Sequence, residues 1–223
     1  MNFLPGWFPG GGVAAKIPSI VYQTMVPNTA QNQTSYTNNG VPFGPASPRR
    51  RIFVGVPVTS VNAFPDVMTI GGVSANVAVQ VQQGAGSTRC QIWSAIVPTG
   101  TSGTVFYSIS SGDMDGSAIY VWSAYDLKDS VPYATAIYNS GGSAANVSVN
   151  TLGNGIVIAL ARISNLNPNT ITFSGVSNDS QTSTPSNIHT GGHAGLVLAE
   201  TPRVITASWG TGFAPTACAL SWR

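Results

Sequence analysis

Short runs of alternating apolar and polar residues, each ended by a turn, follow one another along most of this chain. Residues 73–81 show the pattern most plainly, because every second position carries Val or Ala while Ser, Asn and Gln fill most positions between them. A period of two residues is typical of a β-strand with one buried face. Closely spaced glycines mark turns between the runs, at residues 71–72, 84–86, 112–116, 141–142 and 153–155.

The runs recur at intervals of about 8–12 residues without a helical period, which predicts an antiparallel β-sandwich of immunoglobulin-like or jelly-roll type. Residues 155–163 (GIVIALARI) are almost continuously apolar, so we expect a central strand there. The last expected strand should lie inside the sheet, so that removing it would unfold the domain. From residue 49 onward the expected strands are residues 52–59, 67–70, 73–82, 88–97, 104–110, 117–127, 133–138, 146–149, 155–163, 171–173, 195–200, 203–209 and 216–222.

We expect two parts, an extended N-terminal arm at residues 1–48 and a β-sandwich domain at residues 49–223. The first part carries one charged residue, Lys16, and is rich in Pro, Gly and uncharged polar residues. Such a composition does not supply a core of its own, although residues 17–26 could add one strand. Residues 165–193 are the longest polar stretch of the second part and predict a long loop or flap.

Charged residues are few. Nine Lys and Arg and seven Asp and Glu give a net charge of +2, while 43% of the residues are hydrophobic. A soluble domain normally draws about a quarter of its residues from the charged set. Catalytic sites need ionisable groups, and there is no Gly-x-Ser-x-Gly nucleophile motif. Asp126 and Asp129 resemble a glycosidase pair only by fold-level analogy. We therefore expect no enzyme and no cofactor.

Two clusters contain side chains of the kinds that bind metal ions. His189 and His193 are four residues apart, with Asp179 as the one nearby third ligand, but two glycines between the histidines disfavour the helix that would bring them together. Asp113 and Asp115 resemble the opening of a calcium loop, but the glutamate that closes such a loop is missing. We expect a turn in the second cluster and no bound metal in either.

Cys90 and Cys218 each lie on the apolar face of an alternating run, so we expect two buried free thiols, with a single disulfide as the alternative. Residues 1–12 lack a basic region and a cleavage site, so we expect no secretory signal. No uncharged apolar run is long enough for a transmembrane helix. These features predict a protein that is made in a cytoplasm and has no membrane partner.

The arm and the arginine cluster are the candidate partner-binding residues. An arm with Phe3, Leu4, Trp7 and Phe8 exposes apolar area that a groove on another subunit could cover. The alternative is that the arm folds back on its own sandwich. Arg49, Arg50 and Arg51 follow at the boundary of the two expected parts and suit a contact with a neighbouring subunit. We expect no nucleic-acid partner, because such proteins carry broader basic surfaces.

The tryptophans suggest an alternative function. Trp93 and Trp122 follow an apolar and an aromatic neighbour, Ile92 and Tyr120 respectively, so we expect one residue of each pair to face outward. An exposed aromatic ring beside polar side chains can stack on a sugar. A carbohydrate-binding module is therefore the alternative function.

Several segments resemble a known group of proteins. The opening FLPGWFPGG is similar to the start of many small structural proteins of tailed bacteriophages and of prophages of proteobacteria. Residues 68–80 (MTIGGVSANVAVQ), 90–110 (CQIWSAIVPTGTSGTVFYSIS) and 118–127 (AIYVWSAYDL) resemble the same proteins. The resemblance implies a virion component with an immunoglobulin-like or jelly-roll sandwich, such as a capsid decoration, head fibre or tail accessory protein.

On this basis we expect a non-enzymatic structural protein of a bacteriophage virion, anchored by its arm to capsid or tail proteins of the same particle. A homo-oligomer is compatible with this expectation. In the alternative, the protein is a carbohydrate- or receptor-binding module at a vertex or tail tip, and its partner is a host surface glycan.

Overall fold

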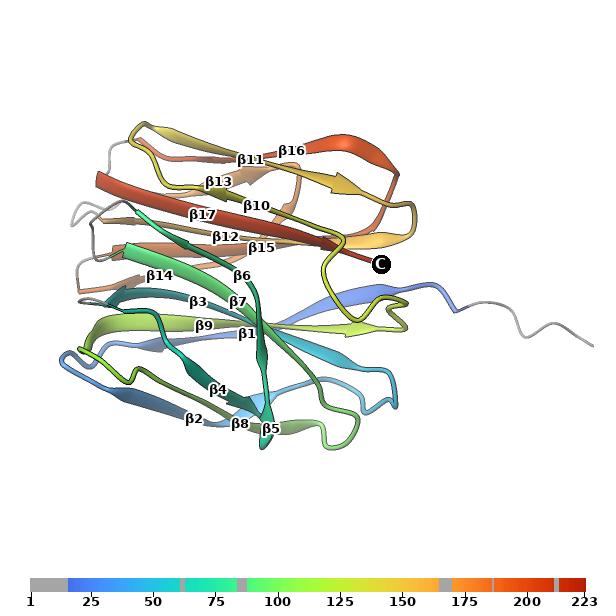
Figure 1. The fold of residues 1–223 in the computed structure, drawn as a ribbon, viewed down its shortest axis with the longest axis horizontal. Coiled ribbons are helices and arrows are strands. Elements are labelled where there is room, and N and C mark those ends of the chain that lie inside the picture. Colours follow the sequence, from blue (N-terminus) through green and yellow to red (C-terminus); the bar gives the residue numbers. More distant parts are fainter. Residues whose placement is uncertain (1–15, 61–62, 84–87, 165–169, 186, 211–212) are drawn as a thin grey trace, which may run out of the picture.

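The computed structural model describes residues 16–60, 63–83, 88–164, 170–185, 187–210 and 213–223 (Figure 1). In these ranges the regular structure is entirely β, with no helix. Accordingly, the described residues include no helix of the length and apolarity needed to cross a membrane. The strands are β1 (Ser19–Asn28), β2 (Ser35–Pro42), β3 (Arg51–Ser60), β4 (Val67–Ile70), β5 (Val73–Ser74), β6 (Asn76–Gln82), β7 (Thr88–Ile96), β8 (Ser102–Ser108), β9 (Met114–Tyr125), β10 (Ala134–Tyr138), β11 (Ala144–Thr151), β12 (Gly155–Ser164), β13 (Thr172–Ser174), β14 (Ser177–Thr184), β15 (Asn187–Val197), β16 (Glu200–Ser208) and β17 (Phe213–Trp222).

The strands form four sheets, stacked as four layers (Figure 1). We call β2-β8-β4-β5 the outer N-sheet and β1-β9-β3-β7-β6 the inner N-sheet. The next layer, β10-β17-β12-β15-β14, is the inner C-sheet, and β11-β16-β13 is the outer C-sheet. All strand pairs are antiparallel. The expected fold class, an all-β antiparallel sandwich, is confirmed.

An apolar layer fills each of the three gaps between sheets. Val54 and Tyr107 belong to the layer between the two N-sheets, and Val157 and Ile205 to the layer between the two C-sheets. The middle layer joins the inner sheets, and its members include the fully buried Trp122. Both inner sheets are therefore buried on both faces, which explains why strands such as β12 are continuously apolar. The prediction of a central strand at residues 155–163 is confirmed.

The two halves of the chain repeat one strand order. In the N-half (β1–β9) the inner sheet runs β1-β9-β3-β7-β6, and in the C-half (β10–β17) the equivalent strands run β10-β17-β12-β15-β14. The outer sheets repeat as well, since β2-β8-β4 corresponds to β11-β16-β13. In each half the first strand pairs with the last and the second with the penultimate, as in a jelly roll. The molecule is thus two jelly-roll sandwiches in tandem, where the sequence predicted one.

The halves pack through their inner sheets with reversed strand order. β1 packs against β14 and β15, while at the opposite edge β6 packs against β10 and β17. In the middle of the interface, β3 packs against β12. This arrangement relates the N-half to the C-half by an approximate two-fold axis through the middle apolar layer.

An arm that extends to residue 48 is not what the structure shows. β1 pairs with β9 over its whole length, and β2 pairs with β8, so residues 19–42 belong to the sandwich. These residues contribute few core side chains, chiefly Ile20, Tyr36 and Val41, because β1 and β2 are edge strands. Their composition resembles that of an arm for this reason. Residues 1–15 lie outside the described residues.

The prediction of a long loop at residues 165–193 is wrong for the residues that the structure describes. They form β13, β14 and the first part of β15, whereas residues 165–169 and 186 lie outside the description. β14 (SNDSQTST) is the edge strand of the inner C-sheet and pairs with β15. A polar edge strand is stabilised by backbone hydrogen bonds, which an apolar–polar pattern does not reveal.

Candidate binding face at the linker

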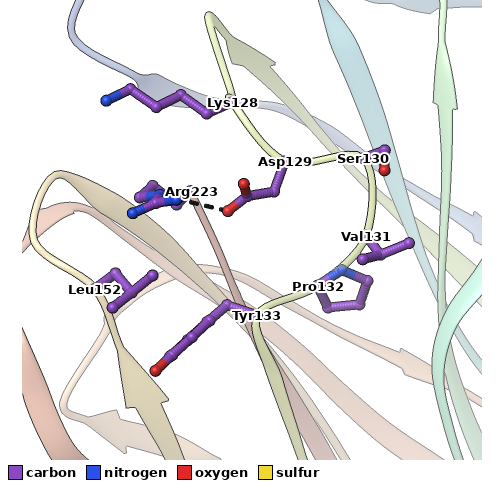
Figure 2. A pocket seen from close by; sticks show the side chains of 8 residues that line it. All are labelled: Lys128, Asp129, Ser130, Val131, Pro132, Tyr133, Leu152 and Arg223. Carbon is purple, nitrogen blue, oxygen red and sulfur yellow. Dashed lines mark ion pairs between the residues drawn. The ribbon is translucent and has the colours of Figure 1, made fainter.

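The linker between β9 and β10, residues 126–133, runs along one end of the molecule where the two halves meet. It borders three adjoining depressions, and Ser130 contributes to the lining of each of them. The largest has a volume of about 490 Å³ (Figure 2). Its lining residues are Lys128, Asp129, Ser130, Val131, Pro132, Tyr133, Leu152 and Arg223.

Hydrogen bonds hold the linker against the end of β17. The backbone N–H groups of Lys128 and Asp129 both donate to the carbonyl oxygen of Arg223, at 2.7 Å each. The Nε1 of Trp222 donates to the carbonyl oxygen of Asp129 at 2.7 Å. Figure 2 shows the Arg223 and Asp129 side chains pointing toward each other, with 3.5 Å between Nε and Oδ2. The largest depression is therefore preformed on a fixed backbone.

The other two depressions continue this surface over the N-half. The second, of about 230 Å³, lies between the linker and Arg49, Arg51 and Ile96. The third, of about 140 Å³, lies between the linker, Val77 and Trp222. We define the linker face as the side chains that carry its apolar and charged groups: Arg49, Arg51, Val77, Ile96, Lys128, Asp129, Val131, Tyr133, Leu152 and Arg223.

The linker face combines exposed apolar groups with positive charge. Val131 is 63% exposed, Ile96 51% and Tyr133 47%. Four cationic side chains accompany a single carboxylate, that of Asp129, which is already paired with Arg223. Exposed apolar groups that gather in one place and are rimmed by polar ones mark interaction surfaces. The arrangement suits contact with the surface of another protein that carries apolar groups and some negative charge.

The structure separates the three arginines that the sequence predicts as partner-binding. Arg49 is exposed and donates one hydrogen bond, from Nη2 to the Leu127 carbonyl oxygen at 3.0 Å. The Arg51 guanidinium lies 4.6 Å from the centre of the Trp222 ring, and burial lowers its pKa. Both belong to the linker face.

Arg50 does not belong to this face, and its assignment as a partner-binding residue is wrong. Its side chain is fully buried, and its guanidinium donates to five backbone carbonyl oxygens. Arg50 thus joins the segment between β2 and β3 to the segment between β7 and β8. Phe3, Leu4, Trp7 and Phe8 lie outside the described residues, so the partner contact expected for them stays a prediction.

The two histidines both lie on β15 but have different surroundings. His189 is fully buried, whereas Nδ1 of His193 lies 2.7 Å from Oδ1 of Asp179. The other carboxylate oxygen of Asp179 accepts a hydrogen bond from Nε1 of Trp122 at 2.6 Å. Because β15 is extended, residues four apart are separated by roughly 13 Å. In the described residues, no three His, Cys, Asp or Glu side chains gather as a metal site would require.

Three of the four acidic candidates, Asp115, Asp126 and Asp129, have structural partners. Oδ1 of Asp115 accepts a hydrogen bond from the backbone N–H of Asn32 at 3.1 Å. Asp126 lies 3.9 Å from Nζ of Lys16, while Asp129 faces Arg223. The pair that resembles glycosidase carboxylates thus forms two separate ion pairs with different cations.

The prediction that one residue of each tryptophan pair faces outward is wrong, because Ile92, Trp93, Tyr120 and Trp122 are all buried in a sheet that is covered on both faces. Trp93 lies in the apolar layer of the N-half and Trp122 in the middle layer, and Trp209 and Trp222 are buried as well. Trp7 lies outside the described residues. Tyr133, in contrast, is about half exposed and lines the largest of the three depressions.

Both cysteines are free and buried. Sγ of Cys90 lies 3.3 Å from Oγ1 of Thr216, and burial raises the pKa of Cys90 to about 11. Burial also raises the pKa of Cys218.

We expect neither thiol to react with Ellman's reagent in the native protein at pH 8, since a reactive thiolate must be both formed and accessible. Both thiols should react after denaturation in guanidinium chloride. Rapid reaction of the native protein would contradict the burial of the thiols. No reaction after denaturation would mean that the two cysteines form a disulfide.

Comparisons with protein-family models, with curated proteins and with solved structures found no match to this chain.

Proposed function

We propose that this chain is a non-enzymatic structural component of a bacteriophage virion, held to capsid or tail subunits through its linker face and its N-terminal residues. The observation that carries the proposal is the linker face, where exposed apolar side chains lie on a backbone that is already fixed. A preformed surface loses little conformational entropy when a partner binds. The particle is proposed to be a phage virion because residues 68–80, 90–110 and 118–127 resemble phage structural proteins.

The energetics favour a contact of this type. Full burial of an exposed Val, Ile or Phe side chain is worth about 1.5–3 kcal/mol. Val131, Ile96 and Tyr133 are each about half exposed, so covering them would contribute about 1 kcal/mol each. The uncharged polar residues that make up much of the remaining surface cost less to desolvate than charges do. Binding therefore requires no strong electrostatic complementarity beyond the few cations of the linker face.

The fold supports the same class of function by analogy. Jelly rolls occur in viral capsid proteins and in lectins, although a fold does not by itself specify a function. Two jelly rolls in tandem give a thick, rigid body with both inner sheets buried, which suits a building block that is exposed to solvent on a particle.

Binding of a host glycan at a vertex or tail tip is the second candidate function. Tyr133 favours it, because its half-exposed side chain lines the same depression as the polar groups of Asp129 and Arg223 (Figure 2). Aromatic rings with adjacent hydrogen-bonding groups are suited to sugars. In this candidate the same face binds a carbohydrate instead of a protein.

Val131→Asp should reduce the copy number of the protein per particle at least tenfold, because it places a carboxylate in the apolar part of the linker face. The measurement is quantitative mass spectrometry of purified particles after complementation with each variant. Val204→Asp is the matched control, since Val204 is a similarly exposed valine on β16 in the outer C-sheet. The control should be incorporated as the wild type is.

Normal incorporation of both variants would contradict the role of the linker face. A glycan array separates the second candidate. Binding to a defined glycan that Tyr133→Ala abolishes, together with normal incorporation of Val131→Asp, would favour carbohydrate recognition over assembly.

A further inference from the structure

A cluster of polar side chains lies at one end of the middle apolar layer, between the inner sheets. His189, Arg162 and Thr216 are directly opposite one another on the adjacent strands β15, β12 and β17. Arg162 points into the gap between the inner sheets, because it is two residues beyond the core residue Leu160 on the same face of β12. Cys90 of the inner N-sheet contacts Thr216 across this gap.

The Arg162 guanidinium is only partly satisfied. Its side chain is fully buried, and Nη2 donates to Oγ1 of Thr59 at 2.5 Å and to Oδ1 of Asn187. Among the described residues, Nε and Nη1 have no hydrogen-bond partner. Burial lowers the pKa of Arg162 to about 9, with a smaller contribution from the charge of Arg89. The group is therefore still protonated at neutral pH.

No carboxylate balances this buried charge. All seven Asp and Glu residues of the chain lie in the part that the structure describes, and none forms an ion pair with Arg162. A buried cation without a counter-ion is strongly unfavourable, since its desolvation is not compensated. The fold thus leaves an unneutralised positive charge between its two halves.

Two further polar groups in the same region lack partners. Nδ1 of His189 is buried and makes no hydrogen bond within the described residues. Oγ1 of Thr88 is also buried and also has no hydrogen-bond partner there. Thr88 shares a face of β7 with Cys90, because the two are two residues apart. Burial and the charge of Arg162 lower the pKa of His189, so its imidazole is neutral and has one N–H to donate. The unpartnered groups can all act as donors.

We propose that a small inorganic anion, chloride in ordinary buffers, is bound between the inner sheets by Nε and Nη1 of Arg162, with His189 and Thr88 as further donors. An anion supplies the missing countercharge and accepts hydrogen bonds from several donors at once. A monatomic ion suits the site because the surrounding side chains are almost completely buried. The anion would link the N-half to the C-half and is independent of the linker face.

The test measures the thermal midpoint of unfolding as chloride replaces gluconate at constant ionic strength. Above the dissociation constant, each tenfold increase in chloride should raise the midpoint by about 3–5 °C, as expected for a ligand that binds only the folded state of a chain of this size. Arg162→Met should abolish the response. Arg203→Met, which removes a partly exposed arginine paired with Glu200, should retain it.

A crystal grown in sodium bromide provides a readout that does not depend on the folding of the Arg162 variant. An anomalous bromide peak within hydrogen-bond distance of Nε and Nη1 of Arg162 would support the site. Water alone at this position would overturn the proposal, as would a chloride response that persists in Arg162→Met.

Discussion

Arg50→Met is expected to lower the free energy of unfolding by about 3–5 kcal/mol, because it leaves several buried backbone carbonyl oxygens without a donor. The Arg50 guanidinium donates from Nε to the Val97 carbonyl oxygen at 2.8 Å and from Nη2 to that of Thr99 at 2.7 Å. Its Nη1 donates to the carbonyl oxygens of the segment that precedes β3, at Phe43, Gly44 and Pro45. Methionine fills a similar volume but donates none of these hydrogen bonds.

Arg49→Met is the matched control, since it changes the adjacent residue in the same way. Arg49 is exposed and makes one hydrogen bond to the backbone, so its replacement should change the stability by about 0.5 kcal/mol or less. Equilibrium unfolding in urea, followed by far-ultraviolet circular dichroism, measures the free energy of unfolding of both variants. Similar small losses for the two variants would show that the Arg50 hydrogen bonds do not stabilise the fold.

Trp122→Ala should destabilise the protein by about 3–5 kcal/mol, the range found when a large buried aromatic side chain is removed from a core. Trp122 lies in the middle apolar layer, stacked on Tyr120 with 6.2 Å between ring centres. Its Nε1 also donates to the nearly buried carboxylate of Asp179. The substitution therefore opens a cavity between the two halves and removes a donor from a buried acceptor.

Trp122→Phe separates these two effects. It keeps much of the ring but removes the hydrogen bond to Asp179, so a smaller loss of about 1–3 kcal/mol is expected. The same urea experiment measures both variants. Equal losses for Ala and Phe would show that the hydrogen bond, and not the packing of the ring, is what Trp122 contributes.

The sequence was sufficient to predict the fold class, because successive residues of a β-strand point to opposite faces and a half-buried strand therefore alternates apolar and polar residues. The central position of β12 followed from its continuous apolar run. The parity of positions along a strand could also have identified two buried arginines, of which one was predicted to lie at a partner contact and the other was not singled out. Arg50 has the same parity as Ile52 and Val54, and Arg162 has the same parity as Leu160, so both charged side chains were placed on a buried face by the pattern alone.

Other features depend on tertiary contacts that no local pattern contains. β2 and β14 have little apolar character of their own and are defined by their pairing with β8 and β15. The linker face is assembled from segments far apart in the chain, including Arg49 and Arg51, the linker at residues 128–133, and Arg223. The repeat of the strand order also escaped sequence reasoning, since equivalent strands need to share only their pairing and not their residues.

The repeated strand order has a consequence for how stability depends on concentration. Two separate jelly rolls that met through such inner sheets would form a dimer, and the dimer would dissociate on dilution. Here the linker at residues 126–133 joins the two halves covalently, so each is always present at a high effective concentration for the other. The interface between the halves therefore persists in a single dilute molecule.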